Sequence, residues 1–257
     1  MMKTPFCFPG KSAAIAICLF STACLLKAGP PFVTDDPEPV AYRHWEVNLA
    51  SQLNHDAGGW SGTSPHLEIN YGAVPNLQVH MIAPLAFVAP AGEPARFGYG
   101  DTELGLKYRF VQQTKSLPQI GVFPTVELPT GDAGRGLGTG HTDIYLPIWF
   151  QKNFGQWTTY GGGGYWINPG PENRNWWFAG WLIQRQIASN LALGAEIFYE
   201  TAKVEGGQAS AAVNAGGIWD LSERYHLMFS AGHTIKGSSA FQGYAALQVT
   251  FGPAEPK

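Results

Sequence analysis

From His44 onward, apolar and polar residues alternate along the chain with a period of two. A period of two is typical of β-strands, whereas an amphipathic helix repeats every 3.6 residues. The alternation divides into segments of about 10–13 residues, the length that a tilted strand needs to cross a bilayer. The twelve segments are 43–53, 64–73, 76–88, 99–111, 117–128, 142–152, 156–167, 175–186, 190–200, 209–219, 224–234 and 240–251. The pattern therefore predicts an all-β chain of about twelve strands.

The two faces of these predicted strands differ in charge. One parity is apolar, beginning with Trp45, Val47 and Leu49, and we expect no charged side chain on it within the strand bodies. The opposite parity carries the charges, which are Glu46, Glu68, Glu103, Lys107, Arg109, Glu127, Asp143, Glu196 and Glu200. A soluble barrel would turn this charged face to solvent, and a membrane barrel would turn it to the lumen.

Three features favour the membrane barrel. The charged face has few charges for a solvated surface and also carries small residues such as Gly105 and Gly194. Aromatic residues gather near the segment ends, as interfacial girdles require. The last segment alternates and ends in Phe251, which resembles the terminal strand of bacterial outer-membrane proteins, although GPAEPK follows it. We therefore predict that the charged parity lines a lumen.

The connections between the segments alternate in length. The longer ones are Asn54–Thr63, Ala89–Gly98, Pro129–His141 and Asn168–Arg174, and the tight ones lie at 74–75, 188–189 and 221–223. Long loops on one side and short turns on the other are typical of outer-membrane barrels, whose even strand number leaves both termini in the periplasm. We predict a single antiparallel transmembrane barrel over residues 43–251 with a tail at 252–257. The location is then the outer membrane of a Gram-negative bacterium.

The N-terminus has the layout of an export signal. Lys3 and Lys11 precede about 15 apolar or small residues, a stretch too short to span a bilayer as a helix. We predict a cleaved signal over residues 1–28. Cleavage after Ala23, which would leave Cys24 for lipidation, remains the alternative to cleavage after Ala28. All three cysteines lie before residue 25, so the mature chain would have no disulfide and no thiolate metal site.

Residues 29–42 form a leader that is rich in proline and acid, and we expect it to be extended. Its Asp35 and Asp36 are candidates to enter the lumen from the periplasmic side. The whole chain carries 16 basic and 19 acidic residues. Nucleic-acid binders usually show a basic surplus, so we expect no nucleic-acid partner.

Five stretches carry a family resemblance: PPFVTDDPEPV (30–40), HLEINYGAVPNLQVHMIAPLAF (66–87), GDTELGLKYRF (100–110), FPTVELPTGD (123–132) and GLGTGHTDIYLPIWFQKNFGQWTTYGGGGYW (136–166). They resemble the outer-membrane proteins grouped as the "MetA-pathway of phenol degradation" family, and the later strands match in pattern only. The resemblance implies one outer-membrane barrel that passes small hydrophobic or aromatic compounds. It supplies no catalytic motif.

Motifs that suggest chemistry have simpler interpretations. The glycine-rich stretch 129–141 lacks the Gly-Lys-Ser/Thr ending of a phosphate-binding loop, so we interpret it as an extracellular loop. His141 and Asp143 lie two residues apart, but no serine stands in a compelling setting beside them. His44, His66 and His80 share the lumen parity at different heights, which disfavours a metal site. We expect no catalytic residue, no metal and no cofactor.

The charged parity allows two interpretations. Its side chains could brace a narrow barrel as a polar network, or its excess of acids could line a weakly cation-favouring pore. Twelve strands lie between the filled eight-stranded barrels and the wide porins, so a narrow or plugged passage is expected. Trp176 and Trp177 belong either to an interfacial belt or to a point where aromatic solutes enter.

These observations predict a barrel through which a small solute passes passively. A barrel enzyme that acts on lipid and a structural surface barrel are the alternatives. The expected partners are the lipid of the outer membrane, the solute, and the barrel-assembly machinery, which would recognise the C-terminal strand at 240–251.

Overall fold

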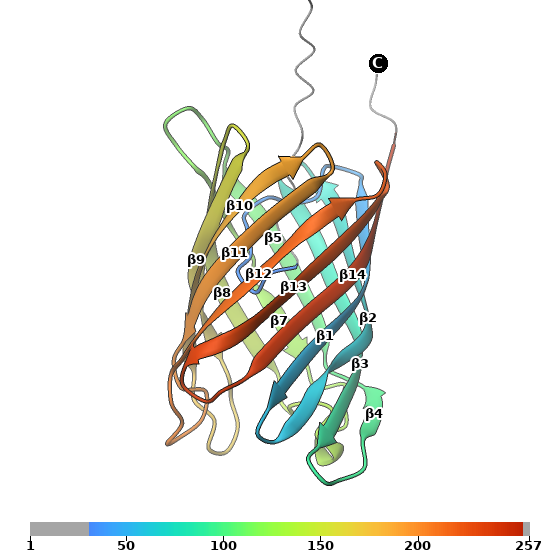
Figure 1. Ribbon diagram of the computed structural model, residues 1–257, viewed down its shortest axis with the longest axis vertical. Helices are drawn as coiled ribbons and strands as arrows, with labels where there is room; N and C mark the ends of the chain where they lie inside the picture. Colours follow the sequence, from blue (N-terminus) through green and yellow to red (C-terminus); the bar gives the residue numbers. More distant parts are fainter. Residues whose placement is uncertain (1–30, 254–257) are drawn as a thin grey trace, which may run out of the picture.

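The structure is a computed structural model that describes residues 31–253 (Figure 1). Its strands form one antiparallel sheet, which closes because the first strand pairs with the last from Trp45↔Phe251 to His55↔Phe241. In chain order the elements are β1 (Trp45–Asp56), β2 (Gly59–Val74), β3 (Leu77–Pro90), β4 (Arg96–Tyr99), β5 (Thr102–Val111), β6 (Gln119–Val122), β7 (Thr125–Leu128), the 3₁₀ turn η1 (Ala133–Arg135), β8 (Asp143–Phe154), β9 (Trp157–Ile167), β10 (Trp176–Ala188), β11 (Leu191–Glu200), β12 (Ser210–Asp220), β13 (Tyr225–Lys236) and β14 (Phe241–Phe251).

Two strands of the barrel are interrupted. β4 and β5 both pair with β3, and β6 and β7 both pair with β5 and β8, so each of these two pairs forms one broken strand. The fourteen segments therefore build a twelve-stranded antiparallel barrel, which confirms the predicted fold class. Within residues 31–253, no helix is long and apolar enough to cross a membrane.

Proline explains the break between β6 and β7. Pro124 has no N–H to donate to a ladder, so the regular hydrogen bonding of the strand is interrupted there. Its carbonyl still accepts a hydrogen bond from the Leu106 N–H at 3.1 Å, which keeps the broken strand beside β5. Phe123 precedes the proline, and its side chain is buried inside the barrel.

Some predicted boundaries were wrong at the end of the barrel that carries the long connections. Residues 54–63 are not a long loop, because β1 and β2 extend to a turn at Ala57–Gly58. Gly59 follows this turn at φ 122°, a conformation that favours glycine. The segment predicted at 64–73 is therefore the longer β2, and the segments predicted at 99–111 and 117–128 are the two broken strands.

The two faces of the sheet separate as the alternation predicts. Along β10, exposed and buried residues alternate strictly from Trp176 to Arg185. The exposed set includes Trp177, Trp181 and Ile183. Arg185 is an exception to the uncharged outer parity: it is exposed near the turn that follows β10 and lies over the Trp157 ring at 5.2 Å. A ring face attracts a cation, which suits an arginine at an interface.

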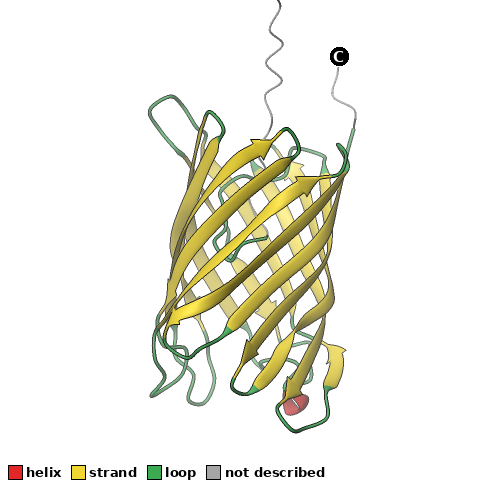
Figure 2. Cartoon of the chain, viewed as in Figure 1, coloured by secondary structure: helices red, strands yellow, loops and turns green. Residues whose placement is uncertain are grey.

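The ends of the barrel differ in their connections (Figure 2). Short turns join β2 to β3, β8 to β9, β10 to β11 and β12 to β13, and the longer connections between β7 and β8, β9 and β10, and β11 and β12 lie at the opposite end. The placement of both termini in the periplasm stays a prediction. The predicted signal at 1–28 with its cysteines, and residues 254–257 of the tail, lie outside the described residues.

Candidate functional site

The leader lies inside the barrel. Residues 31–41 form no strand and run through the lumen as the blue segment enclosed by the strands in Figure 1. Asp36 is 0% exposed, and Thr34 and Val40 are buried as well. Residues 31–41 therefore occupy space that would otherwise be open passage.

One end of this segment is held by β11 and β13. The carboxylate of Glu196 accepts the backbone N–H of Val33 at 2.9 Å through Oε1 and that of Thr34 at 2.7 Å through Oε2. The Ser230 hydroxyl donates to the Pro31 carbonyl at 2.5 Å. A charged acceptor makes stronger hydrogen bonds than a neutral one. Glu196 therefore holds the backbone of Val33 and Thr34 in place, although these residues belong to no strand.

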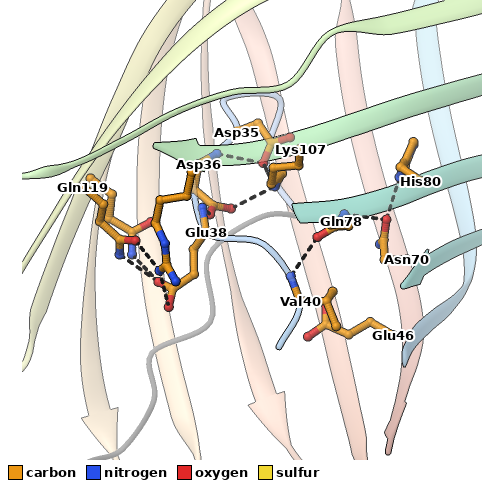
Figure 3. Close-up of polar contacts among 12 residues, drawn as sticks. Asp35, Asp36, Glu38, Val40, Glu46, Asn70, Gln78, His80, Lys107 and Gln119 are labelled. Carbon is orange, nitrogen blue, oxygen red and sulfur yellow. Dashed lines mark hydrogen bonds and ion pairs between the residues drawn. The ribbon is translucent and has the colours of Figure 1, made fainter. Parts of the chain in front are cut away.

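The middle of the segment pairs with β5. Lys107 places Nζ 2.9 Å from Asp35 Oδ1 and 3.5 Å from Asp36 Oδ2 (Figure 3). Burial raises the pKa of the Asp36 carboxyl above its ordinary value, and the Lys107 ammonium opposes that rise. A buried lysine needs such partners, because burying an unpaired charge in a protein interior costs roughly several kcal/mol of free energy per ion.

Glu38 connects the leader to three barrel strands. Its Oε2 accepts the side-chain amides of Gln119 and Gln151, each at 2.9 Å, and its Oε1 lies 3.6 Å from Arg109 Nη1. Gln119 belongs to β6, Gln151 to β8 and Arg109 to β5. These contacts and those of Lys107 are polar and come from side chains, so the leader is attached to the wall without becoming part of the sheet.

A hydrogen-bonded chain continues from the leader across β3 and β2. The Val40 N–H donates to Gln78 Oε1 at 2.9 Å, and the Gln78 amide donates to Asn70 Oδ1 at 2.7 Å (Figure 3). Asn70 in turn donates to Glu68 Oε1 at 2.7 Å. These buried polar side chains are stable on the barrel wall because each of them has a hydrogen-bond partner.

His80 joins this chain to β5. Its Nδ1 is 2.6 Å from Asn70 Oδ1 and its Nε2 is 2.9 Å from Glu103 Oε1. A cavity of about 150 Å³ lies beside these groups, between the leader and the wall formed by β1, β2, β3 and β5. Its lining is Asp35, Glu38, Glu46, Glu68, Asn70, Gln78, His80, Ile82, Glu103, Lys107 and Phe123. The cavity is therefore lined mostly by polar side chains, and five of them are carboxylates.

The opposite part of the lumen is aromatic. The buried cluster there consists of Phe123, Trp149, Trp176, Phe178, Phe198 and Ala212, with Tyr145 and Trp166 packed against it. The Trp166 ring stacks on Tyr145 at 4.6 Å and on Trp176 at 5.3 Å between ring centroids. We call these eight residues the aromatic wall.

Sequence reasoning did not single out the aromatic wall. Its members lie on the same parity as the charges, so the alternation already contained the signal. The charges alone do not reveal the aromatic wall. When the charged parity is interpreted as uniformly polar, each aromatic residue on it looks like a local exception rather than part of a second, apolar side of the lumen. Trp149 and Phe178 are such exceptions, and the structure places their ring centroids 6.0 Å apart.

The nine predicted charged side chains fall into two groups, with Glu196 and Glu200 apart from both. Glu46, Glu68, Glu103 and Lys107 line the cavity, and Arg109 approaches it through Glu38. Glu127 lies in register with Glu103 on one side and Asp143 on the other, so three acids form a row across β5, β7 and β8. Glu196 anchors the leader, and the ninth charge, Glu200, pairs with Lys203 at 2.8 Å.

The adjacent Trp176 and Trp177 lie on opposite faces of the sheet. Trp176 is 9% exposed and belongs to the aromatic wall, where Lys203 Nζ lies 4.2 Å from its ring centroid. Trp177 is 59% exposed on the outer face and contacts Tyr165 at 4.8 Å between ring centroids. Only Trp176 is therefore placed to meet a solute inside the barrel.

The loop between β7 and β8 packs at the mouth with the long connections. The Asp101 carboxylate accepts the N–H groups of Gly131 at 2.9 Å and Thr139 at 2.6 Å. Leu137 is buried between these attachments. The glycine-rich stretch 129–141 thus folds back against the barrel, where it contains the short η1 turn.

His141 is a structural link in the same region. Its Nδ1 is 2.7 Å from Asp143 Oδ1, and its Nε2 faces the Asn173 amide at 2.8 Å. Both ring nitrogens are therefore used to join β8 to the 168–175 loop. Over the described part of the chain, no group of three or more His, Cys, Asp or Glu side chains could hold a metal ion.

Comparisons with known proteins agree with this architecture. Residues 47–251 match the model of the family described as "Putative MetA-pathway of phenol degradation". No curated protein matches the sequence.

Solved structures that resemble this chain include outer-membrane barrels. An outer-membrane channel from Pseudomonas putida F1 superposes with a TM-score of 0.67 and 15% identity, covering 84% of this chain and 98% of that one. The KdgM porin, solved in complex with disordered oligogalacturonate, superposes with a TM-score of 0.57 and 10% identity, covering 80% of this chain and 99% of that one. The translocator domain of the autotransporter NalP from Neisseria meningitidis superposes with a TM-score of 0.53 and 11% identity, covering 81% of this chain and 88% of that one. At these identities the likeness shows the fold.

Proposed function

The chain belongs to the family described as "Putative MetA-pathway of phenol degradation", and from this membership we propose that it is an outer-membrane channel for passive passage of a small hydrophobic or aromatic solute. The observation that carries the proposal is the lumen itself. A closed barrel holds an aromatic wall on one side and a polar cavity on the other, and residues 31–41 of the leader, which form no strand, lie in the lumen.

The outer surface supports a location in the outer membrane of a Gram-negative bacterium. Large apolar side chains such as Leu49, Trp181 and Ile197 point outward and are about half exposed. A soluble protein rarely exposes so much contiguous apolar surface, whereas lipid covers it in a membrane barrel. Lipid is therefore a partner, and the barrel-assembly machinery would recognise the C-terminal strand β14, predicted at 240–251.

The leader argues for a narrow passage rather than a wide pore. A wide porin lumen is filled with water, whereas residues 31–41 cross this lumen and contact β3, β5, β6, β8, β11 and β13. A solute that passes must therefore fit between the leader and the wall or displace the leader. The aromatic wall provides contacts that suit a small planar apolar molecule, because offset-stacked and edge-to-face rings attract one another.

Solute flux through purified protein in liposomes tests the proposal. We expect phenol to equilibrate faster across liposomes that contain the protein than across empty ones, and a large hydrophilic sugar to be retained. Because phenol also crosses lipid directly, the rate is compared at several protein-to-lipid ratios and must rise with protein. Equal rates at all ratios would reject the channel, and release of fatty acids from the liposomes would favour the lipid-hydrolase alternative.

A further inference from the structure

The cavity between the leader and the β1–β5 wall has a strong charge imbalance. Asp35, Glu38, Glu46, Glu68 and Glu103 line it with five carboxylates, whereas Lys107 supplies one ammonium, His80 one imidazole, and Arg109 a guanidinium 3.6 Å from Glu38. Two of the five acids come from the leader and three from the barrel strands. The leader therefore contributes to the charge of the passage as well as narrowing it (Figure 3).

Some of this negative charge is not neutralised locally. Glu68 is 5% exposed, and its Oε1 accepts the Asn70 amide. The His80 ring, which is charged only when protonated, places Nδ1 3.8 Å from the same oxygen, and Glu68 lines the cavity. A carboxylate that is largely removed from bulk water and accepts one amide is stabilised further by water or a cation in the cavity.

The acidic lining also extends toward the mouth with the long connections. Glu103 reaches the cavity, and Glu127 and Asp143 continue from it across the neighbouring strands in register. No three of these groups are arranged to coordinate one metal ion within the described chain. The carboxylates that line the cavity therefore give a negative field along one side of the lumen, as in charged rings that set the selectivity of pores.

We propose that this acidic side of the lumen makes the passage cation-selective, so that monovalent cations and organic ammonium groups pass or bind in preference to anions. The inference rests on the proposed function, since selectivity requires a passage. It also gives the solute a charge preference: among aromatic compounds, a neutral or ammonium-bearing ring is favoured over a carboxylate-bearing one. A cation would occupy the cavity beside Glu68 while its apolar part contacts Phe123, which belongs to both the cavity lining and the aromatic wall.

Reversal potentials of the full-length mature protein in planar bilayers test the proposal. Under a KCl gradient we expect K⁺ to be preferred over Cl⁻ by about threefold or more, as a lumen field of one sign concentrates counter-ions. The double variant Glu46→Gln/Glu68→Gln keeps both side-chain shapes and removes two charges, and its preference should fall toward unity. Glu205→Gln, an exposed loop acid, is the matched control and should keep the wild-type preference.

The outcomes separate the two proposals. Current without a preference for K⁺ would overturn cation selectivity and leave the channel proposal intact. The same holds if the preference survives Glu46→Gln/Glu68→Gln in a barrel whose electrophoretic mobility still shifts on boiling, which shows that it is folded. Absence of any current or flux would overturn both proposals. A second readout, faster uptake of an aromatic ammonium ion than of benzoate in liposomes, should change in the same direction in the double variant.

Discussion

Lys107 of β5 and Asp35 of the leader form an ion pair inside the lumen, with Nζ and Oδ1 2.9 Å apart and the two residues 72 positions apart in sequence. We predict that Lys107→Met releases the middle of the leader. Removing one partner of a buried ion pair costs about 3–5 kcal/mol, because the other charges lose their counter-ion. Single-channel conductance in planar bilayers should rise relative to the wild type.

Lys115→Met is the control for that experiment. Lys115 is an exposed lysine in the connection between β5 and β6. Its replacement should leave the conductance unchanged. A Lys107→Met barrel that is folded but conducts like the wild type would show that the ion pair does not hold the leader in place.

Glu196 offers an independent test of leader attachment. Glu196→Ala removes the acceptor of the Val33 and Thr34 N–H groups, and hydrogen bonds to charged groups contribute about 1.5–3 kcal/mol each. Thr34 is fully buried, so a cysteine placed there by Thr34→Cys should react slowly with a maleimide. In a Glu196→Ala background the labelling rate should increase.

The control for labelling lies on the same strand. Glu200→Ala removes another β11 carboxylate, one that pairs with Lys203 rather than with the leader. It should leave the labelling rate of Thr34→Cys low. Equal labelling in both backgrounds would show that Glu196 is not an anchor.

The sequence was sufficient to predict the barrel but only part of its interior. Alternation identifies which residues share a face, because the period of a strand is two, and it places Glu68 and Lys107 on the inner wall from the sequence alone. It cannot give the strand-to-strand register that aligns Glu103 with Glu127, which depends on pairing between distant segments. The positions of the leader contacts depend in the same way on side chains far apart in sequence, such as Ser230 and Pro31.

Trp176 and Trp177 allow a test of the aromatic wall with neighbouring residues. We predict that Trp176→Ala slows phenol uptake into liposomes by about threefold, since a stacking contact of an aromatic ring is worth roughly 0.5–1.5 kcal/mol beyond its buried area. Trp177→Ala should leave uptake unchanged because that ring lies on the outer face. Equal slowing by both variants would point to a general loss of barrel integrity, and no effect of Trp176→Ala would remove the aromatic wall from the solute path.

Gly180 of β10 makes room for the leader. A Cβ atom at this position would lie 2.2 Å from Thr34 Oγ1 and 2.9 Å from Phe178 Cζ, closer than real contacts allow. We predict that Gly180→Ala displaces the leader near Thr34 and raises the single-channel conductance, while the barrel still shifts its mobility on boiling. The double variant Gly180→Ala/Thr34→Ala removes the clashing hydroxyl and should return conductance toward the wild-type value. Ala179→Val adds volume at the neighbouring outward-facing position and should leave the conductance unchanged. A rise in conductance in Ala179→Val, or no rise in Gly180→Ala, would contradict the close packing of the leader against β10.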